Sequence, residues 1–266
     1  MGGGIAHAFA AAGVDVIVVE VDHDCADATR RAIVQSLSHA GARGHVSDVE
    51  AAIAHLSVTD ERTALSDAPL VVEAVPEQLD LKRHVLGRIE AAVAPDAVVA
   101  SNTSSISIDS LAAALDRPAR FLGMHFFNPV PVSQLVELVR GAATDPEALA
   151  SARAAAERIG KETIEVADAP GFASSRLGVA MGLEAIRMLE GRVASAEDID
   201  RAMVLGYRFP MGPLRLTDLV GLDVRLGIAE YLHAQLGERF APPELLRDKV
   251  ARGELGKKSG RGFFDW

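Results

Sequence analysis

The stretch MGGGIAHAFAAAGVDVIVVEVD, residues 1–22, decides the fold class of this chain. Residues 5–12 predict a helix that ends at Gly13, because glycine readily adopts the backbone conformation that closes a helix. Residues 14–22 are almost wholly apolar and rich in valine, which is typical of a strand buried on both faces of a sheet. A helix followed by such a strand indicates a layered α/β architecture.

The same stretch also carries the parts of a dinucleotide site. In such a unit, glycines let the backbone approach a pyrophosphate, and an acidic residue ending the second strand binds the ribose 2′-hydroxyl. Gly2 and Glu20 occupy these two positions. A run of glycines alone is equally typical of a flexible terminus, so the prediction rests on the strand and on Glu20. A carboxylate at Glu20 would repel a 2′-phosphate, which favours NAD over NADP as the cofactor.

The alternation of strands and helices continues through the first two-thirds of the chain. Strand-like segments recur at residues 68–77, 97–105, 120–129 and 162–168, with helix-like segments at 24–40, 78–93, 108–115 and 146–159. This order predicts a Rossmann-like, doubly wound parallel sheet over residues 1–167. Helical patterns then dominate, so residues 168–266 are predicted to form a second, mainly helical domain. Residues 1–167 hold the whole net charge of −10, whereas residues 168–266 are balanced.

Composition excludes several classes of protein. With 49% hydrophobic and 24% charged residues, the chain is not disordered, and no apolar run approaches the roughly 20 residues of a membrane-spanning helix. The acidic balance argues against nucleic acid as a partner. The single cysteine, Cys25, indicates a reducing compartment and a cytoplasmic location. Asp22 and Asp24 flank a histidine as metal ligands could, but this segment is interpreted as a helix cap, and no metal is expected.

Two polar segments carry the candidate chemistry. HFFNPVPVSQLVELV, residues 125–139, contains His125 and Glu137, which a turn could bring together. Histidine suits proton removal from an alcohol because its pKa lies near neutrality, and a carboxylate on its other nitrogen fixes the tautomer. The alternative is a satisfied core histidine and a surface glutamate. SNTSS, residues 101–105, follows a buried strand and is predicted at the carboxyl edge of the sheet, where ligands bind; a serine-rich helix cap is also compatible.

Seven segments match one family in order and spacing over nearly the whole chain. They are MGGGIAHAFAAAG, VVEAVPE, ASNTSSISI, GMHFFNPVPVSQLVELV, DAPGF, RFPMGPLRLTDLVGLD and GKKSGRGFFDW. On these segments the chain resembles the 3-hydroxyacyl-CoA dehydrogenase family, in particular its short bacterial 3-hydroxybutyryl-CoA members. The resemblance implies hydride transfer between (S)-3-hydroxyacyl-CoA and NAD to give 3-oxoacyl-CoA, in fatty acid or butanoate metabolism, by a homodimer.

The resemblance also implies the roles of individual residues. His125 would be the base, Glu137 its partner, and Ser104 a hydrogen-bond donor to the reacting oxygen of the substrate. Cofactor contacts are implied for Gly2, Glu20, Glu77, Lys82, Ser104, Asn128 and Lys258. Contacts with the CoA substrate are implied for Ser36 and Ser104, and more weakly for Arg43. Each lysine, taken alone, would be more typical of a solvated surface charge.

The chain departs from the family pattern in two places. The family commonly has asparagine where PGFASSR places Ser175. The serine side chain is shorter, so its contact with the substrate is expected to be lost or bridged by water. Met1 aligns with an internal methionine of the glycine motif, so the first strand and the first two glycines of that motif are lacking. Loss of a central strand would leave backbone donors and acceptors on both neighbouring strands without partners. Each such group costs about 1–3 kcal/mol if it is buried without a hydrogen bond. We therefore expect the natural protein to begin upstream of Met1, which its intact mass would test.

Two other functions stay open on the sequence alone. The chain could be a noncatalytic acyl-CoA-binding or structural relative, which its lack of the first strand favours. It could also be a sugar-acid dehydrogenase of the gulonate type with the same fold, although HFFNPVPV is more similar to the acyl-CoA branch. Turnover of acetoacetyl-CoA with NADH, compared with gulonate and NAD, separates these possibilities.

Overall fold

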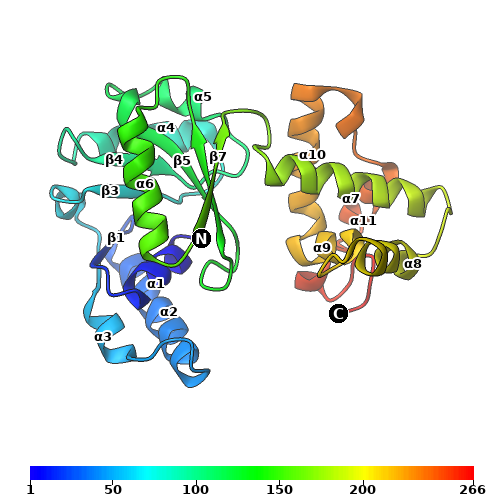
Figure 1. Cartoon of the computed structure of the whole chain (residues 1–266), viewed down its shortest axis with the longest axis horizontal. Coiled ribbons are helices and arrows are strands. Elements are labelled where there is room, and N and C mark those ends of the chain that lie inside the picture. Colours follow the sequence, from blue (N-terminus) through cyan, green and yellow to red (C-terminus); the bar gives the residue numbers. More distant parts are fainter. The chain divides into compact units, whose positions relative to one another are not determined.

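The computed structural model describes all residues, Met1–Trp266, as two compact units (Figure 1). Unit 1 comprises Met1–Asp168 and combines strands with helices, whereas unit 2 comprises Ala169–Trp266 and is mainly helical. The predicted fold class, a Rossmann-like sheet followed by a helical domain, is confirmed.

Unit 1 contains thirteen helices and strands. They are α1 (Gly2–Ala11), β1 (Val16–Val19), α2 (His23–Ala42), α3 (Val49–Ala54), β2 (Leu56–Thr59), β3 (Leu70–Glu73), α4 (Leu79–Glu90), β4 (Val98–Ser101), α5 (Ile108–Ala112), β5 (Phe121–Phe126), β6 (Leu135–Arg140), α6 (Pro146–Arg158) and β7 (Glu162–Ala167). The elements α3, β2 and β6 were not expected from the sequence.

The strands form two sheets. β1 pairs with β2 in parallel, and the second sheet has the order β3-β4-β5-β6-β7. The expectation of a wholly parallel sheet is wrong at β6, which runs antiparallel to β5 and parallel to β7. Only residues 127–134 separate β5 from β6, and a parallel crossover needs a dozen or more residues, so the chain returns as a hairpin. β1 and β3 share no ladder.

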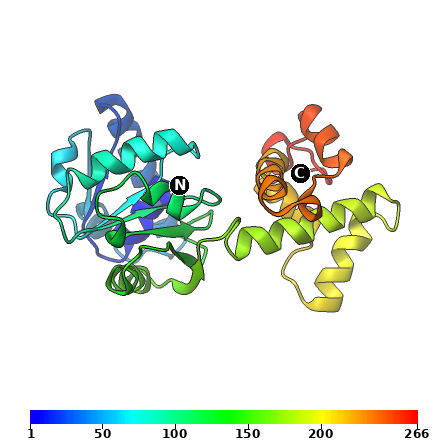
Figure 2. The same ribbon diagram turned by 90° about the horizontal axis from the view of Figure 1, so that it is seen from above.

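Alternation along the strands divides the larger sheet into two faces. Leu122, Met124 and Phe126 of β5, with Val136 and Leu138 of β6, pack in one buried cluster with side chains of α1 and α6. The residues between them face the other way, where Gly123 lies against Ile108 of α5. Figure 2 shows α4 and α6 on opposite faces of this sheet. His125 and Glu137 therefore lie on the face opposite α6.

Unit 2 is built around a helical core. Its helices are α7 (Ser174–Glu190), α8 (Ala196–Arg201), α9 (Pro213–Val220), α10 (Leu222–Leu236) and α11 (Glu244–Ala251), and a π-helical turn at Ala202–Gly206 follows α8. The fully buried Asp218 of α9 accepts hydrogen bonds from Phe263 N, Phe264 N and Trp266 Nε1, and so anchors the C-terminal segment. No helix in either unit is both long enough and apolar enough to cross a membrane.

The core of unit 1 makes a first prediction. Leu122 is fully buried, so Leu122→Ala should lower the free energy of unfolding by about 2–5 kcal/mol through lost burial and the cavity left behind. Urea denaturation followed by circular dichroism measures this. Val21→Ala is the matched control because Val21 is exposed, and an equal loss in both variants would contradict the assigned core.

Candidate active site

A histidine–carboxylate pair lies in the middle of the β5–β6 hairpin. The antiparallel register sets His125 directly opposite Glu137, and His125 Nδ1 lies 2.7 Å from Glu137 Oε2. Glu137 is fully buried and His125 nearly so. Nδ1 faces the carboxylate, so Nε2 is the ring nitrogen that points away from Glu137. The predicted contact between these two residues is confirmed.

The loop after β4 is gathered around one carboxylate. Glu77 Oε1 accepts hydrogen bonds from Thr103 Oγ1, Ser104 N, Ser105 N and Ser105 Oγ over 2.5–3.2 Å. Burial alone would raise the pKa of Glu77, but the hydrogen bond from Thr103, the charge of Lys82 and the loop donors together lower it. The half-buried Ser104 thus stands in a loop with a defined backbone at the carboxyl edge of the sheet, as predicted.

A buried ion pair between Lys82 and Glu73 lies at the ends of the strands that lead into this loop. Lys82 Nζ donates to Glu73 Oε1 at 2.8 Å and to Glu73 Oε2 at 3.0 Å, and both side chains are almost completely buried. Ser101 Oγ donates to Glu73 Oε2 at 2.6 Å, which joins the end of β4 to the end of β3. The cofactor contact expected for Lys82 stays a prediction; its ammonium group is hydrogen-bonded to Glu73 and to Val75 O.

Asn102 links the loop to the strand of the candidate base. Asn102 N donates to Glu73 O at 2.8 Å, and Asn102 Oδ1 accepts from Phe126 N at 2.9 Å. Phe126 directly follows His125 in β5. Sequence reasoning did not single out Glu73, Asn102 or Thr103. Their positions in the sequence could have revealed them, because each is a polar residue that ends or follows a predicted buried strand.

The residues of unit 1 present donor and acceptor groups that suit NAD. α1 begins at Gly2, has no acidic side chain in its first turn and no side-chain cap, so its end favours an anionic group such as a pyrophosphate. A Cβ at Gly4 would lie only 3.3 Å from Val130, so glycine lets α1 pack closely there. Glu20 directly follows β1, and its Oε1 accepts from Thr29 Oγ1 at 2.8 Å while the other oxygen can accept from a ribose hydroxyl. Asp22 caps α2 through Cys25 N, as interpreted from the sequence.

The predicted CoA contact Ser36 has a partner that the sequence did not reveal. His7 Nδ1 of α1 lies 2.8 Å from Ser36 Oγ of α2. His7 is buried, and burial together with the nearby Lys161 lowers the pKa of its imidazole. Lys161 is itself buried and donates to Val130 O at 2.8 Å. Arg43 is exposed just after α2.

The remaining predicted residues lie in other surroundings. Asn128 is exposed in the loop between β5 and β6. Ser175 and Lys258 belong to unit 2, where Ser175 lies in the first turn of α7 and Lys258 Nζ donates to Asp223 Oδ2 at 2.6 Å. The structure brings together His125 with Glu137, and Ser104 with Glu77 and Lys82.

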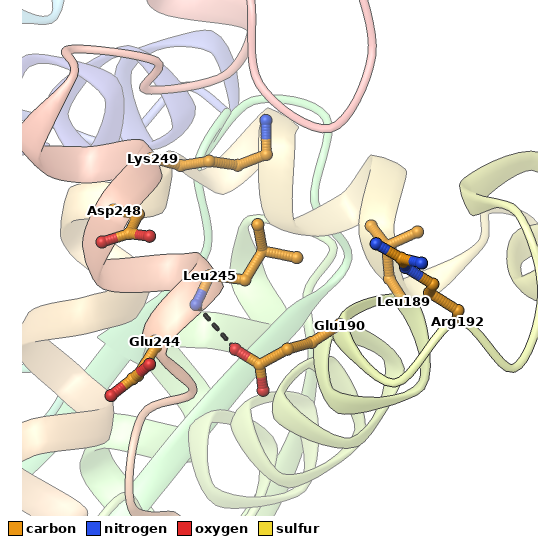
Figure 3. Close-up of a pocket in the computed structure, with 7 residues that line it drawn as sticks. All are labelled: Leu189, Glu190, Arg192, Glu244, Leu245, Asp248 and Lys249. Carbon is orange, nitrogen blue, oxygen red and sulfur yellow. Dashed lines mark hydrogen bonds between the residues drawn. The ribbon is translucent and has the colours of Figure 1, made fainter.

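Unit 2 also has a surface hollow between the end of α7 and α11 (Figure 3). Two of its charged groups are bonded within the fold: Glu190 Oε1 accepts from Leu245 N at 2.8 Å in the first turn of α11. Lys249 Nζ donates to Glu254 Oε2 and Gly262 O, both at 2.7 Å. None of the predicted site residues lines this hollow.

Together the α/β sheet, the acidic end of β1 and the buried histidine–carboxylate pair define a nicotinamide-dependent dehydrogenase. Comparison with known proteins identifies the family. Residues 1–169 match the model of the NAD binding domain of 3-hydroxyacyl-CoA dehydrogenase, and residues 171–266 match that of its C-terminal domain. The chain belongs to the 3-hydroxyacyl-CoA dehydrogenase family and is an NAD-linked oxidoreductase, as the sequence resemblance predicted.

Individual relatives cover this chain from end to end. A 3-hydroxybutyryl-CoA dehydrogenase of Mycobacterium tuberculosis is 46% identical over 271 residues, which are 100% of this chain and 95% of the relative. Among solved structures, M. tuberculosis FadB2 has a TM-score of 0.95 at 46% identity. The (S)-3-hydroxybutyryl-CoA dehydrogenase PaaH1 of Ralstonia eutropha has a TM-score of 0.94 at 39% identity, and both alignments cover 100% of this chain and 95% of the other.

The lowered pKa of His7 predicts a dependence of stability on pH. Unfolded histidine binds a proton near pH 6.5 whereas folded His7 does so only at lower pH, so the unfolding free energy falls as the pH drops below 6.5. His7→Gln, which can still bond Ser36, should make this fall shallower. Urea titrations between pH 7.5 and 5 measure it, with the exposed His84 changed to Gln as control. Equal slopes in both variants would contradict the prediction.

Proposed function

We propose that the chain interconverts (S)-3-hydroxyacyl-CoA and 3-oxoacyl-CoA with a short acyl group, such as 3-hydroxybutyryl-CoA, and that His125 is the base. The observation that carries this proposal is the 2.7 Å contact between His125 Nδ1 and the fully buried Glu137. The names of the two relatives from M. tuberculosis and R. eutropha support the short acyl group.

The chain's own residues divide the reaction between them. His125 Nε2 takes the proton from the C3 hydroxyl of the substrate, and Glu137 stabilises the imidazolium that results. Bound NAD supplies the acceptor for the hydride that leaves C3. Ser104 donates a hydrogen bond to the C3 oxygen, which holds the reacting carbon in place. In the opposite direction His125 returns the same proton.

Contacts with cofactor and substrate complete the proposal. The start of α1 at Gly2 receives the pyrophosphate, and Glu20 accepts from the ribose of the adenosine half. Glu77 and Asn128 lie toward the nicotinamide ribose, and Lys82 and Lys258 also serve the cofactor. The substrate contacts follow from the family resemblance: Ser36 and Arg43 contact CoA, and Ser175 lies toward the acyl group.

The central functional prediction concerns the loss of activity when the proposed base or its partner is replaced. His125→Ala should lower kcat for acetoacetyl-CoA reduction with NADH by about 10²–10⁴-fold, the usual contribution of a general acid or base. Glu137→Gln keeps the shape but removes the charge that stabilises the imidazolium, so it should also lower kcat. His84→Gln is the control because His84 is an exposed histidine of the same unit.

The same assay decides between functions. Wild-type turnover of acetoacetyl-CoA, without turnover of gulonate and NAD, is the expected result. Near-normal kcat in His125→Ala would refute the assigned base. Turnover of gulonate would favour a sugar-acid dehydrogenase, and no turnover of either substrate would favour a binding protein.

We also propose that the protein is a homodimer formed through unit 2. Leu205 and Tyr207 are 70% and 73% exposed, and Leu219 is 46% exposed, which leaves apolar side chains uncovered on one chain. Leu219→Glu should therefore shift the protein toward the monomer in sedimentation equilibrium, whereas Leu79→Glu, at a partly exposed site in unit 1, should not. A wild-type protein that sediments as a monomer would overturn the proposal.

A cytoplasmic location is proposed from cysteine chemistry. Cys25 has no partner for a disulfide within the chain. A free thiol suits a reducing compartment, where disulfides are rare. Fractionation of the producing cell tests this location.

A further inference from the structure

Arg225 of α10 is a buried cation without a counterion. The residue is 5% exposed, and its Nε is buried with no hydrogen-bond partner. No carboxylate oxygen lies within 4.0 Å of the guanidinium. Burial lowers the pKa of the guanidinium to about 10, so the group stays charged at neutral pH. A buried charge is costly unless it is paired, as Asp218 is in the same unit, so Arg225 indicates a place for an anion from outside the chain.

The guanidinium lies against a stripe of α7 that lacks side chains. A Cβ at Gly178 would lie 3.6 Å from Arg225 Nη1, and a Cβ at Gly182 would lie 3.6 Å from Nε and 3.7 Å from Cζ. The two glycines are four residues apart, so they lie on the same side of the helix. Gly182 is buried whereas Gly178 is half-buried. The stripe therefore runs from the core toward the surface, and Nη1 lies beside its outer end.

The outer end of the stripe leads to Ser175. This residue precedes Gly178 by three positions, so it lies on the same side of α7 at a distance of about 4.5 Å along the helix axis. Ser175 is also half-buried, and the proposed function places the acyl group of the substrate beside it. An acyl chain that passes Ser175 and follows the glycines would bring its far end to Arg225. A methyl group there would leave the cation unpaired, whereas a carboxylate would pair with it.

We propose that Arg225 binds a carboxylate and thereby selects 3-hydroxyacyl-CoA substrates whose acyl chain ends in a carboxyl group. This inference rests on the proposed function, which assigns Ser175 to the acyl group. A guanidinium suits this role because its planar fork can donate two parallel hydrogen bonds to one carboxylate. A free carboxylic acid in solution would offer the same group, so its binding is measured separately from the selection of substrates.

Matched pairs of thioesters test the selection. The 3-oxoacyl-CoA of six, seven and eight carbons with a terminal carboxylate is compared, at each length, with the thioester that ends in a methyl group. At the length that fits, the wild type with NADH should have a kcat/KM about 10–100-fold higher for the carboxylate, which is the usual size of a charge-assisted hydrogen bond. Arg225→Met should remove this preference and leave kcat/KM for acetoacetyl-CoA nearly unchanged. Absence of the preference at every length, or its persistence in Arg225→Met, overturns the proposal.

Three other variants separate the charge, the path and the surface. Arg225→Lys keeps the cation but not the fork, so it should retain only part of the preference. Gly178→Leu leaves the cation in place and covers Nη1 with a side chain, so it should lower the preference as Arg225→Met does. Arg201→Met is the matched control, because the Arg201 side chain is 71% exposed in the same unit, and it should behave as the wild type. An undiminished preference in Gly178→Leu would contradict the path along α7.

Unfolding of the cofactor-free protein tests the site without any activity. An unpaired buried cation destabilises the fold, so Arg225→Met should have an unfolding free energy no lower than that of the wild type. A marked loss of stability would mean that Arg225 serves the fold, and it would overturn the proposal.

Binding of glutarate separates the two sources of the carboxylate. Glutarate should raise the Tm of the wild type, but not that of Arg225→Met, relative to sodium chloride of equal ionic strength. This shift without any preference among the thioesters would assign the site to a free carboxylate and overturn the selection of substrates. If the wild type reduces no thioester, acetoacetyl-CoA included, the proposed function fails, whereas the glutarate shift still decides whether Arg225 binds carboxylates.

Discussion

The antiparallel pairing of β5 with β6 is the constraint on which the rest of the site depends. It makes His125 and Glu137 cross-strand neighbours, and a slip of one residue would turn one of them to the opposite face of the sheet. The register is held by apolar side chains rather than by the pair itself. Leu122, Met124 and Leu138 alternate with the polar pair and are completely buried in the cluster beneath α6. The chemistry on one face is thus aligned by hydrophobic packing on the other.

Several buried carboxylates in this structure fix the positions of the groups that are hydrogen-bonded to them. Burial of a charge is costly unless hydrogen bonds or a counterion compensate it. Glu73 is compensated by Lys82, and Asp218 by three donors of the C-terminal segment. Glu137 is compensated in part by His125, so the compensating group of this carboxylate is also the proposed base. The hydrogen bond that offsets the cost of burying Glu137 also holds the His125 ring in a fixed orientation.

Most of the architecture could be predicted from the sequence because the strands consist mainly of apolar residues. β1, β3, β4, β5 and β7 all lie within expected segments. β6 was not expected because the charged residue Glu137 interrupts its apolar run, whereas the structure buries this residue completely. The pairing of Lys82 with Glu73 was not expected either, because Glu73 belongs to another element and only the folded chain shows that pairing. Local patterns predict elements, but they do not show which charges a fold will bury together.

The two halves of the candidate chemistry are joined by Asn102. Its amide is held by the end of β3 through Glu73 O, and its side-chain oxygen accepts the amide of Phe126, the residue after His125. The Ser104 loop is therefore hydrogen-bonded to the strand that carries the proposed base. Proton removal and orientation of the substrate oxygen require accurately placed groups. A loop that is hydrogen-bonded to the strand of the proposed base fits this requirement better than two independently supported groups would.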